Sequence, residues 1–126
     1  MSRDVVASPA LAPSAGPFSP AMLVDGFLYV SGQVGQDPAT GRLVEGGVLA
    51  EAEQTLANLE VVLAAAGMGL EHAVRVGVYL TRIEDFETMN GVYARHFRPP
   101  YPARTTIGVA ALPLGARVEI DLVAKA

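Results

Sequence analysis

The chain lacks several residue types on which common chemistries depend. Its 126 residues include no cysteine and no tryptophan, and only two histidines, His72 and His96. Without cysteine there is no disulfide, no thiolate nucleophile and no cysteine-ligated zinc site, and two histidines are too few for a histidine-based metal cluster. Neither histidine has a serine or acidic partner at a recognisable spacing, so no hydrolase triad is visible. We therefore predict no metal site.

Positive charge is also scarce. Nine basic residues face 13 acidic ones, which gives a net charge of −4 and a pI near 5.0, and no run of lysine and arginine forms a patch. This balance argues against binding to a phosphate backbone. The first twenty residues lack the apolar region of a signal peptide, and the apolar stretch VVLAAAGMGL is too short to span a bilayer. We predict a cytoplasmic protein that binds neither nucleic acid nor membrane.

Apolar residues, in contrast, are abundant. They make up 51% of the chain, and the mean hydropathy is +0.34. A domain of this length buries roughly two-thirds of its unfolded surface. Apolar area is therefore expected to remain after the core is filled, which suggests a subunit interface.

Turn signals and periodicity predict the elements of the N-terminal half. Residues 3–11 favour a short strand, and AMLVDGFLYVSG favours a β-hairpin in which Asp25-Gly26 supplies the positive φ angles of a two-residue turn. A helix ending at Gly67 follows, because apolar side chains recur at the helical period. This stripe consists of Ala52, Leu56, Leu59, Leu63 and Ala66. We expect the other face to meet water; it carries Glu51, Glu53, Gln54, Asn58 and Glu60.

The C-terminal half predicts a strand, a helix and two further strands. HAVRVGVYLT alternates with period two, at Val74, Val76, Val78 and Leu80. The second helix is expected to begin near Glu84, with Thr81 and Glu84 forming a capping box, and to end before Pro99. Its apolar stripe is Phe86, Met89, Tyr93 and Phe97. ARTTIGVA and ARVEIDLVA predict the closing strands.

This order of elements, β, ββ, α, β, α, β, β, predicts an α+β fold in which two helices pack on one face of a sheet. No linker, repeat or low-complexity segment interrupts it, so we predict a single domain over residues 1–126. Phe27 and Tyr29 share the face away from the helices, and a partner chain is therefore expected to cover that face.

The segment PPYPARTTIGV, residues 99–109, contains the first candidate for function. Three prolines within four residues fix φ and leave little backbone freedom before Arg104. On the strand that follows, Arg104 shares a face with Thr106 and Gly108, which leaves room around the guanidinium. Such a fork can bind a carboxylate through two parallel hydrogen bonds. A solvated strand-end charge is the alternative, because most arginines are largely exposed.

Four other positions are candidates, each with a structural alternative. Glu119 in RVEIDLV can act as a general base, or it can simply lie on the solvated side of a half-buried strand. Asn90, at the border of the second helix's apolar stripe, can contact a ligand or satisfy nearby backbone groups. Ser31-Gly32 at a strand end offers exposed N–H groups to an anion, although strand ends commonly carry both residue types.

Several of these stretches, in this order, resemble a known family. GPFSPA, LYVSGQVGQDPATG, FETMNGVYARHF, PPYPART and VAALPLGARVEID resemble the Rid family, the reactive intermediate deaminases, also called the YjgF or L-PSP family. The resemblance extends from about Ser14 to Ala124. It implies a mixed sheet backed by two helices, similar to the bacterial-type chorismate mutase. It also implies a homotrimer with ligand sites in the clefts between neighbouring subunits.

The resemblance also implies roles for individual residues. Arg104 in PARTT corresponds to the family's carboxylate-binding arginine, and Glu119 in VEI corresponds to the acid that orients the attacking water. Other substrate-binding positions are matched by Phe18, Ser31, Gly32, Asn90 and Thr106. Thr106 stands where the best-known members have cysteine, at a position that contributes mainly its backbone.

The chain departs from the family pattern in the loop before the hairpin. Where the deaminases commonly read Pro-Tyr-Ser-Gln, this chain reads Pro-Phe-Ser-Pro over residues 17–20. Phe18 keeps the ring but loses the hydroxyl, and Pro20 removes an amide side chain and a backbone donor. Loss of a site hydroxyl can shift substrate preference.

The activity implied is hydrolysis of an enamine or imine, such as 2-aminoacrylate, to a 2-oxo acid and ammonia, without a metal or organic cofactor. The partner implied is a small carboxylate-bearing imine or enamine. A non-catalytic module that binds a small carboxylate in the same cleft is the alternative, favoured by Phe18 and Pro20. The ribonuclease activity described for some relatives is disfavoured by the acidic pI.

Overall fold

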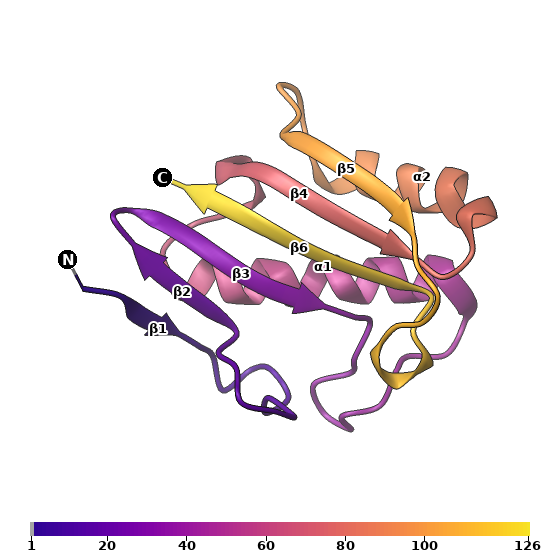
Figure 1. The fold of residues 1–126 in the computed structure, drawn as a ribbon, viewed down its shortest axis with the longest axis horizontal. Coiled ribbons are helices and arrows are strands. Elements are labelled where there is room, and N and C mark those ends of the chain that lie inside the picture. Colours follow the sequence, from indigo (N-terminus) through magenta and orange to yellow (C-terminus); the bar gives the residue numbers. More distant parts are fainter. Residues whose placement is uncertain (1) are drawn as a thin grey trace.

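The structure is a computed structural model that describes residues 2–126, and it contains one six-stranded sheet with two helices on one face (Figure 1). The strands are β1 (Asp4–Val6), β2 (Ala21–Val24), β3 (Phe27–Gln33), β4 (Ala73–Leu80), β5 (Ala103–Gly108) and β6 (Val118–Lys125). The helices are α1 (Gly47–Ala65) and α2 (Phe86–His96), with short 3-10 helices η1 (Leu70–His72), η2 (Ile83–Asp85) and η3 (Pro113–Gly115). The predicted α+β fold with its two helices is confirmed. No helix in the described residues is long and apolar enough to cross a membrane.

The sheet is mixed, with strand order β1-β2-β3-β6-β4-β5. β4 and β5 are parallel, and the other neighbouring pairs of described strands are antiparallel. The C-terminal strand β6 therefore lies in the middle of the sheet, between β3 and β4, and β5 lies at one edge (Figure 1).

The hairpin of β2 and β3 forms around the predicted turn. Asp25 and Gly26 both have positive φ, 52° and 80°, as a two-residue type I′ turn requires. The turn fixes the register, which sets Ala21 opposite Val30 and Met22 opposite Tyr29. This alternation places Ala21 and Val30 in the core and leaves Tyr29 on the open face, half exposed.

Helix α1 packs its predicted apolar stripe against the sheet. Ala52, Leu56, Leu59 and Leu63 are at most 1% exposed, and the helix ends before Gly67, whose φ of 72° matches a glycine stop. The helix lies behind β3 and β6 in Figure 1, with α2 beside it behind β4 and β5. The main core therefore lies between this helix layer and one face of the sheet.

The prediction that the other face of α1 meets water was wrong for two residues. Glu51 and Asn58 are 4% and 2% exposed. The Nδ2 group of Asn58 donates to the carbonyl oxygens of Val34 and Gln36, and Glu51 Oε1 accepts the backbone N–H of Arg117 at 2.7 Å. These buried polar groups satisfy backbone groups of a loop and of a strand entry, a use that helical periodicity does not reveal.

Two details of the C-terminal half also differ from prediction. Val74 is 48% exposed, because the register shifts between Ala73 and Arg75 and the strand's alternation begins only after that irregularity. No capping box forms around Glu84: the turn η2 comes first, and α2 begins at Phe86 without a side-chain cap.

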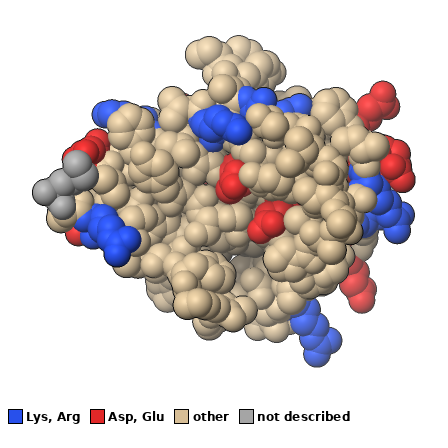
Figure 2. Space-filling model, viewed as in Figure 1, with Lys and Arg blue, Asp and Glu red and all other residues tan. Residues whose placement is uncertain are grey.

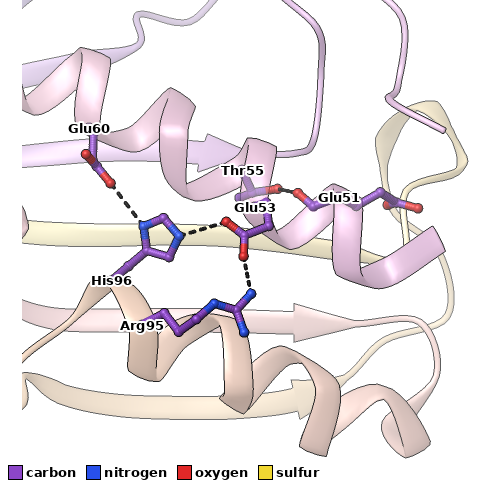
Figure 3. A network of polar contacts seen from close by, with 6 residues as sticks. All are labelled: Glu51, Glu53, Thr55, Glu60, Arg95 and His96. Carbon is purple, nitrogen blue, oxygen red and sulfur yellow. Dashed lines mark hydrogen bonds and ion pairs between the residues drawn. The ribbon is translucent and has the colours of Figure 1, made fainter. Parts of the chain in front are cut away.

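A polar cluster joins the two helices on their outer sides (Figure 3). The ring nitrogens of His96 lie 2.9 Å from Glu53 Oε2 and 3.2 Å from Glu60 Oε1, and Arg95 forms an ion pair with the other oxygen of Glu53. Both ring nitrogens thus face carboxylate oxygens of α1. The cluster fixes α2 against α1.

Candidate functional site

Arg104 lies on the helix-facing side of β5. The parallel pairing with β4 sets it beside Val76 and sets Thr106 beside Val78. Both valines are fully buried under the helices, and paired residues of neighbouring strands share a face. The face shared by Arg104 and Thr106, which the alternation predicted, is therefore the face that α2 covers.

The guanidinium of Arg104 is held by aromatic rings. Its central carbon lies 4.6 Å from the ring centroid of Tyr93 and 5.8 Å from that of Phe86, both on α2. Within residues 2–126, no carboxylate forms an ion pair with Arg104. A cavity of about 340 Å³ opens beside it, lined by Asn90, Tyr93, Ala94, Tyr101, Pro102 and Arg104. The positive charge is thus half-buried with its donors available to an incoming anion.

Unpartnered polar atoms gather around this arginine. Asn90 Oδ1, the Tyr93 hydroxyl and Thr106 Oγ1 are buried without a hydrogen-bond partner. Asn90 and Tyr93 are three residues apart on α2 and so lie on one side of the helix, toward the cavity that both line. Burial raises the pKa of Tyr93, and the charge of Arg104 acts in the opposite direction. An unsatisfied buried polar group costs about 1–3 kcal/mol, so Asn90 Oδ1 and Thr106 Oγ1 are acceptors that a ligand can satisfy.

Glu119 lies on the opposite face of the sheet. It alternates with the buried Val118 and Ile120 on β6, and its carboxylate lies over Gly32 at the irregularity of β3. A Cβ at position 32 would overlap the end of this flexible side chain, so Gly32 leaves room for the Glu119 carboxylate to lie over the strand. Burial raises the pKa of Glu119, and the negative charge of Asp121 raises it further. A carboxylate so placed is a stronger base than one in water.

Ser31 connects this position to the loop that carries Phe18. The Ser31 hydroxyl donates to the carbonyl oxygen of Ser19 at 2.7 Å, and its backbone N–H donates to that of Pro20 at 2.9 Å. Phe18 is 55% exposed and lines a hollow of about 500 Å³ together with Ser31 and Tyr29. Ser31 therefore has a clear structural task, and the neighbouring aromatic ring is left open to contacts.

The predicted site residues thus form two groups on opposite faces of the sheet. We call them the Arg104 group, which consists of Asn90, Arg104 and Thr106, and the Glu119 group, which consists of Phe18, Ser31, Gly32 and Glu119. Figure 2 looks onto the open face, where acidic groups lie near the middle of a largely uncharged surface. Within residues 2–126, no cluster of histidine, aspartate and glutamate could hold a metal ion.

Sequence reasoning missed the aromatic contacts of Arg104. It assigned Tyr93 and Phe86 to an apolar stripe, and Tyr93 is indeed 5% exposed while Phe86 is 38% exposed. The spacing of three between Asn90 and Tyr93 was the available signal, since it sets both toward one partner. That this partner is Arg104 follows only from the packing of β5 against α2.

Comparison with known proteins decides the family. The family model described as Endoribonuclease L-PSP matches residues 9–126. The chain belongs to this family. The resemblance to the L-PSP family that the sequence motifs indicated is therefore confirmed over nearly the whole chain.

Individual proteins are similar to this L-PSP family protein in sequence and fold over most of its length. The bovine protein named 2-iminobutanoate/2-iminopropanoate deaminase is 50% identical over 120 residues, which cover 94% of this chain and 88% of the relative. RidA from the Antarctic bacterium Psychrobacter is 37% identical in a superposition with a TM-score of 0.94, over 98% of this chain and 99% of that one. E. coli TdcF, solved with bound serine, is 27% identical with a TM-score of 0.91 and covers 98% of each chain.

Proposed function

We propose that this protein hydrolyses reactive enamine and imine intermediates, such as 2-aminoacrylate, to 2-oxo acids and ammonia. The half-buried guanidinium of Arg104, which has no acidic partner among the described residues, carries the proposal. A substrate carboxylate supplies the anion that this site lacks. The 50% identity with a protein named 2-iminobutanoate/2-iminopropanoate deaminase supports the same conclusion.

The reaction needs positioning more than specialised chemistry. An enamine first tautomerises to its imine, and water then adds to the imine carbon while the nitrogen takes up a proton. The resulting carbinolamine loses ammonia as its hydroxyl oxygen gives up a proton and becomes the carbonyl of the 2-oxo acid. Arg104 holds the carboxylate, and Glu119 accepts a hydrogen bond from the attacking water and takes its proton. The raised pKa of Glu119 suits this exchange of protons.

A second copy of the chain completes the site. The Arg104 group and the Glu119 group lie on opposite faces of one sheet, so one chain does not bring them to the same substrate. In the trimer that the family resemblance implies, with the architecture of the bacterial-type chorismate mutase, the Arg104 group of one copy meets the Glu119 group of its neighbour. The open sheet face with Tyr29, which is 50% exposed, is then covered as well.

Subunit complementation tests this arrangement. Arg104→Ala and Glu119→Gln are purified separately, mixed at equal concentrations, unfolded and refolded together. Ammonia release is measured with imine generated in the assay by an amino-acid-oxidising enzyme. Each variant alone is expected to lose at least about 100-fold of the activity, since a charge partner of the substrate or the base is missing. The mixture is expected to recover about a quarter of the parental activity, because random assembly places both intact groups at that share of interfaces.

The control is the double variant, Arg104→Ala with Glu119→Gln, mixed with an equal amount of the parent protein. By the same statistics about a quarter of its interfaces are intact, so its activity shows how much recovery is expected after refolding. A mixture of single variants that stays inactive while this control recovers would contradict a shared site. Full activity of Arg104→Ala alone would contradict the proposed function.

Binding of a small carboxylate without catalysis is the second candidate function. The sequence Pro-Phe-Ser-Pro over residues 17–20 favours it, because Phe18 lacks the hydroxyl that the related deaminases commonly present. The two functions differ in one measurement. Tight binding of a 2-oxo acid by the parent protein, with no acceleration of ammonia release, supports the binding module.

A further inference from the structure

The contact between Arg104 and Tyr93 has a consequence for how the guanidinium is presented. An aromatic ring attracts a cation through its face, and the attraction is stronger where water is excluded from the contact. A carboxylate would instead occupy the planar N–H fork with its two oxygens. With its central carbon 4.6 Å from the ring centroid of Tyr93, Arg104 is therefore held while its fork stays available.

Tyr93 is itself immobilised by its neighbours. It is 5% exposed, and its ring stacks on Phe97 at a centroid distance of 4.1 Å and an interplanar angle of 19°. Phe97 is 3% exposed and lies directly after the last turn of α2. The second ring near Arg104, that of Phe86, is farther away at 5.8 Å and 38% exposed. Tyr93 is thus the closer and more buried of the two rings that contact Arg104, and Phe86 is the more distant and more exposed one.

We propose that Tyr93 is a positioning residue for Arg104, whose ring holds the guanidinium in the orientation that receives the substrate carboxylate. The inference rests on the proposed function in that Arg104 binds the substrate. The ring performs this task, since the Tyr93 hydroxyl is buried without a partner and is shielded from solvent. Phenylalanine is therefore the conservative substitute, and an aliphatic residue is the disruptive one.

The test uses Tyr93→Phe and Tyr93→Leu, each in the parent and in an Arg104→Lys background. Binding of 2-oxobutanoate is titrated by NMR, and kcat and KM are measured for imine deamination. Tyr93→Leu is expected to weaken binding and raise KM about tenfold, which corresponds to about 1.4 kcal/mol, and to change kcat less than about twofold. Tyr93→Phe is expected to match the parent. In the Arg104→Lys background, Tyr93→Leu is expected to change binding less than about twofold, because the ring acts by orienting a planar N–H fork and an ammonium group has no such fork.

A second measurement follows the arginine itself. Relaxation of the Arg104 Nε–H group by ¹⁵N NMR is expected to show a rigid side chain in the parent and in Tyr93→Phe, and a mobile one in Tyr93→Leu. Arg42, which lies away from any aromatic contact in the described residues, provides the mobile reference. If the leucine variant does not fold, Tyr93→Met fills the same space with a flexible apolar chain and replaces it.

The outcomes separate this inference from the proposed function. Equal affinity in Tyr93→Leu and the parent, an equal loss in the Arg104→Lys background, or an Arg104 side chain as mobile as Arg42 in the parent would each overturn the positioning role. If the parent shows no deaminase activity while 2-oxobutanoate binding depends on the Tyr93 ring through Arg104, the proposed function fails and the positioning role stands. If the parent binds no 2-oxobutanoate, the positioning role is decided by whether the Arg104 side chain is rigid in the parent and mobile in Tyr93→Leu.

Discussion

Two arginines in different regions of the sheet are held in opposite ways. Arg117, at the entry to β6, donates from Nε and Nη2 to the two carboxylate oxygens of Asp85, at 3.1 and 2.8 Å. Arg104, on the edge strand β5, has two aromatic rings near it and no carboxylate among the described residues. Through these two donors Arg117 joins the start of β6 to the start of α2. The charge of Arg117 is thus paired inside the chain, whereas that of Arg104 is left without an acidic partner among the described residues, as the proposed binding of a substrate carboxylate requires.

The same contrast separates the carboxylates. Glu53 and Glu60 bind His96, and Glu53 also binds Arg95, in the cluster that joins α1 and α2. Glu119 has no cationic partner among residues 2–126, and it lies beside another acid, Asp121, on the open face of the sheet. The two pKa values move in opposite directions: hydrogen bonds from His96 and Arg95 lower the pKa of Glu53, whereas burial first and the charge of Asp121 second raise that of Glu119.

The largest expected effect comes from exchanging the two arginines for methionine, which keeps much of their length. Arg104→Met is expected to lower kcat/KM at least about 100-fold and to leave the free energy of unfolding within about 0.5 kcal/mol of the parent. Arg117→Met is expected to lower the free energy of unfolding by about 2–3 kcal/mol, because it leaves the Asp85 carboxylate, whose side chain is 9% exposed, without its cation. Urea denaturation and steady-state kinetics check both. A lower free energy of unfolding in Arg104→Met would contradict the distinction between Arg117, which stabilises the fold, and Arg104, which is proposed to bind the substrate.

Gly32→Ala tests the Glu119 group without changing a charge. The added Cβ overlaps the Glu119 carboxylate, whose end is free to swing aside, so kcat/KM is expected to fall about 10–100-fold while the fold persists. Kinetics and a melting curve are the measurements. Gly91→Ala is the matched control, because a Cβ there meets no atom within 4 Å, and it is expected to leave kinetics unchanged. Parental kinetics in Gly32→Ala would show that the position of Glu119 is unimportant.

Asp121→Asn sharpens the contrast between the carboxylates through pH. Burial is the larger cause of the raised pKa of Glu119, and the charge of Asp121 is the smaller one, so removing that charge is expected to lower the pKa partway. If the ionised Glu119 is the base, the acidic limb of kcat/KM moves to lower pH. Tyr79→Phe is the control: it removes the hydroxyl that donates to Asp121 Oδ2 at 3.0 Å but keeps the charge. A limb that moves to higher pH in Asp121→Asn would contradict this assignment.

The smallest effect is expected at the helix cluster. Hydrogen bonds from His96 and then Arg95 lower the pKa of Glu53 below 4.5, so the stability that Glu53 contributes is present above about pH 4.5 and lost as pH falls through its folded pKa. Because the Glu53 side chain is 40% exposed, Glu53→Gln is expected to cost less than about 1 kcal/mol at pH 7 and nothing near pH 2. Urea denaturation at both pH values measures this. Equal losses at the two pH values would show that charge is not the cause, and Glu87→Gln is the exposed control.

Much of the fold could be predicted because local signals agreed with it. The Asp25-Gly26 turn, the α1 stripe ending at Gly67 and the alternation of β6 all appear as predicted. The errors occurred where long-range contacts overrode a local pattern. Glu51 and Asn58 are polar residues on a helix yet buried, since they satisfy backbone groups far along the chain. Val74 fits the alternating sequence pattern, yet its side chain is exposed, because pairing with the partner strand shifts the register between Ala73 and Arg75.

For the candidate site, the sequence by itself determined which side chains share a face within one strand. Alternation set Arg104 with Thr106, and it set Glu119 against Val118 and Ile120, because successive residues of a strand point to opposite sides. The family motifs added the expected roles of these residues. Neither source shows which elements Arg104 and Glu119 contact on their two faces of the sheet.

Only the tertiary structure decided that question. The parallel pairing of β5 with β4 turns Arg104 toward α2 and its aromatic rings, and the insertion of β6 between β3 and β4 turns Glu119 toward Gly32 on the other side. Pairing and register join strands that are distant in the chain, and they are set by the packing of the whole core. That packing separates the two groups across one sheet, and it is the physical reason to expect that a second copy brings them together.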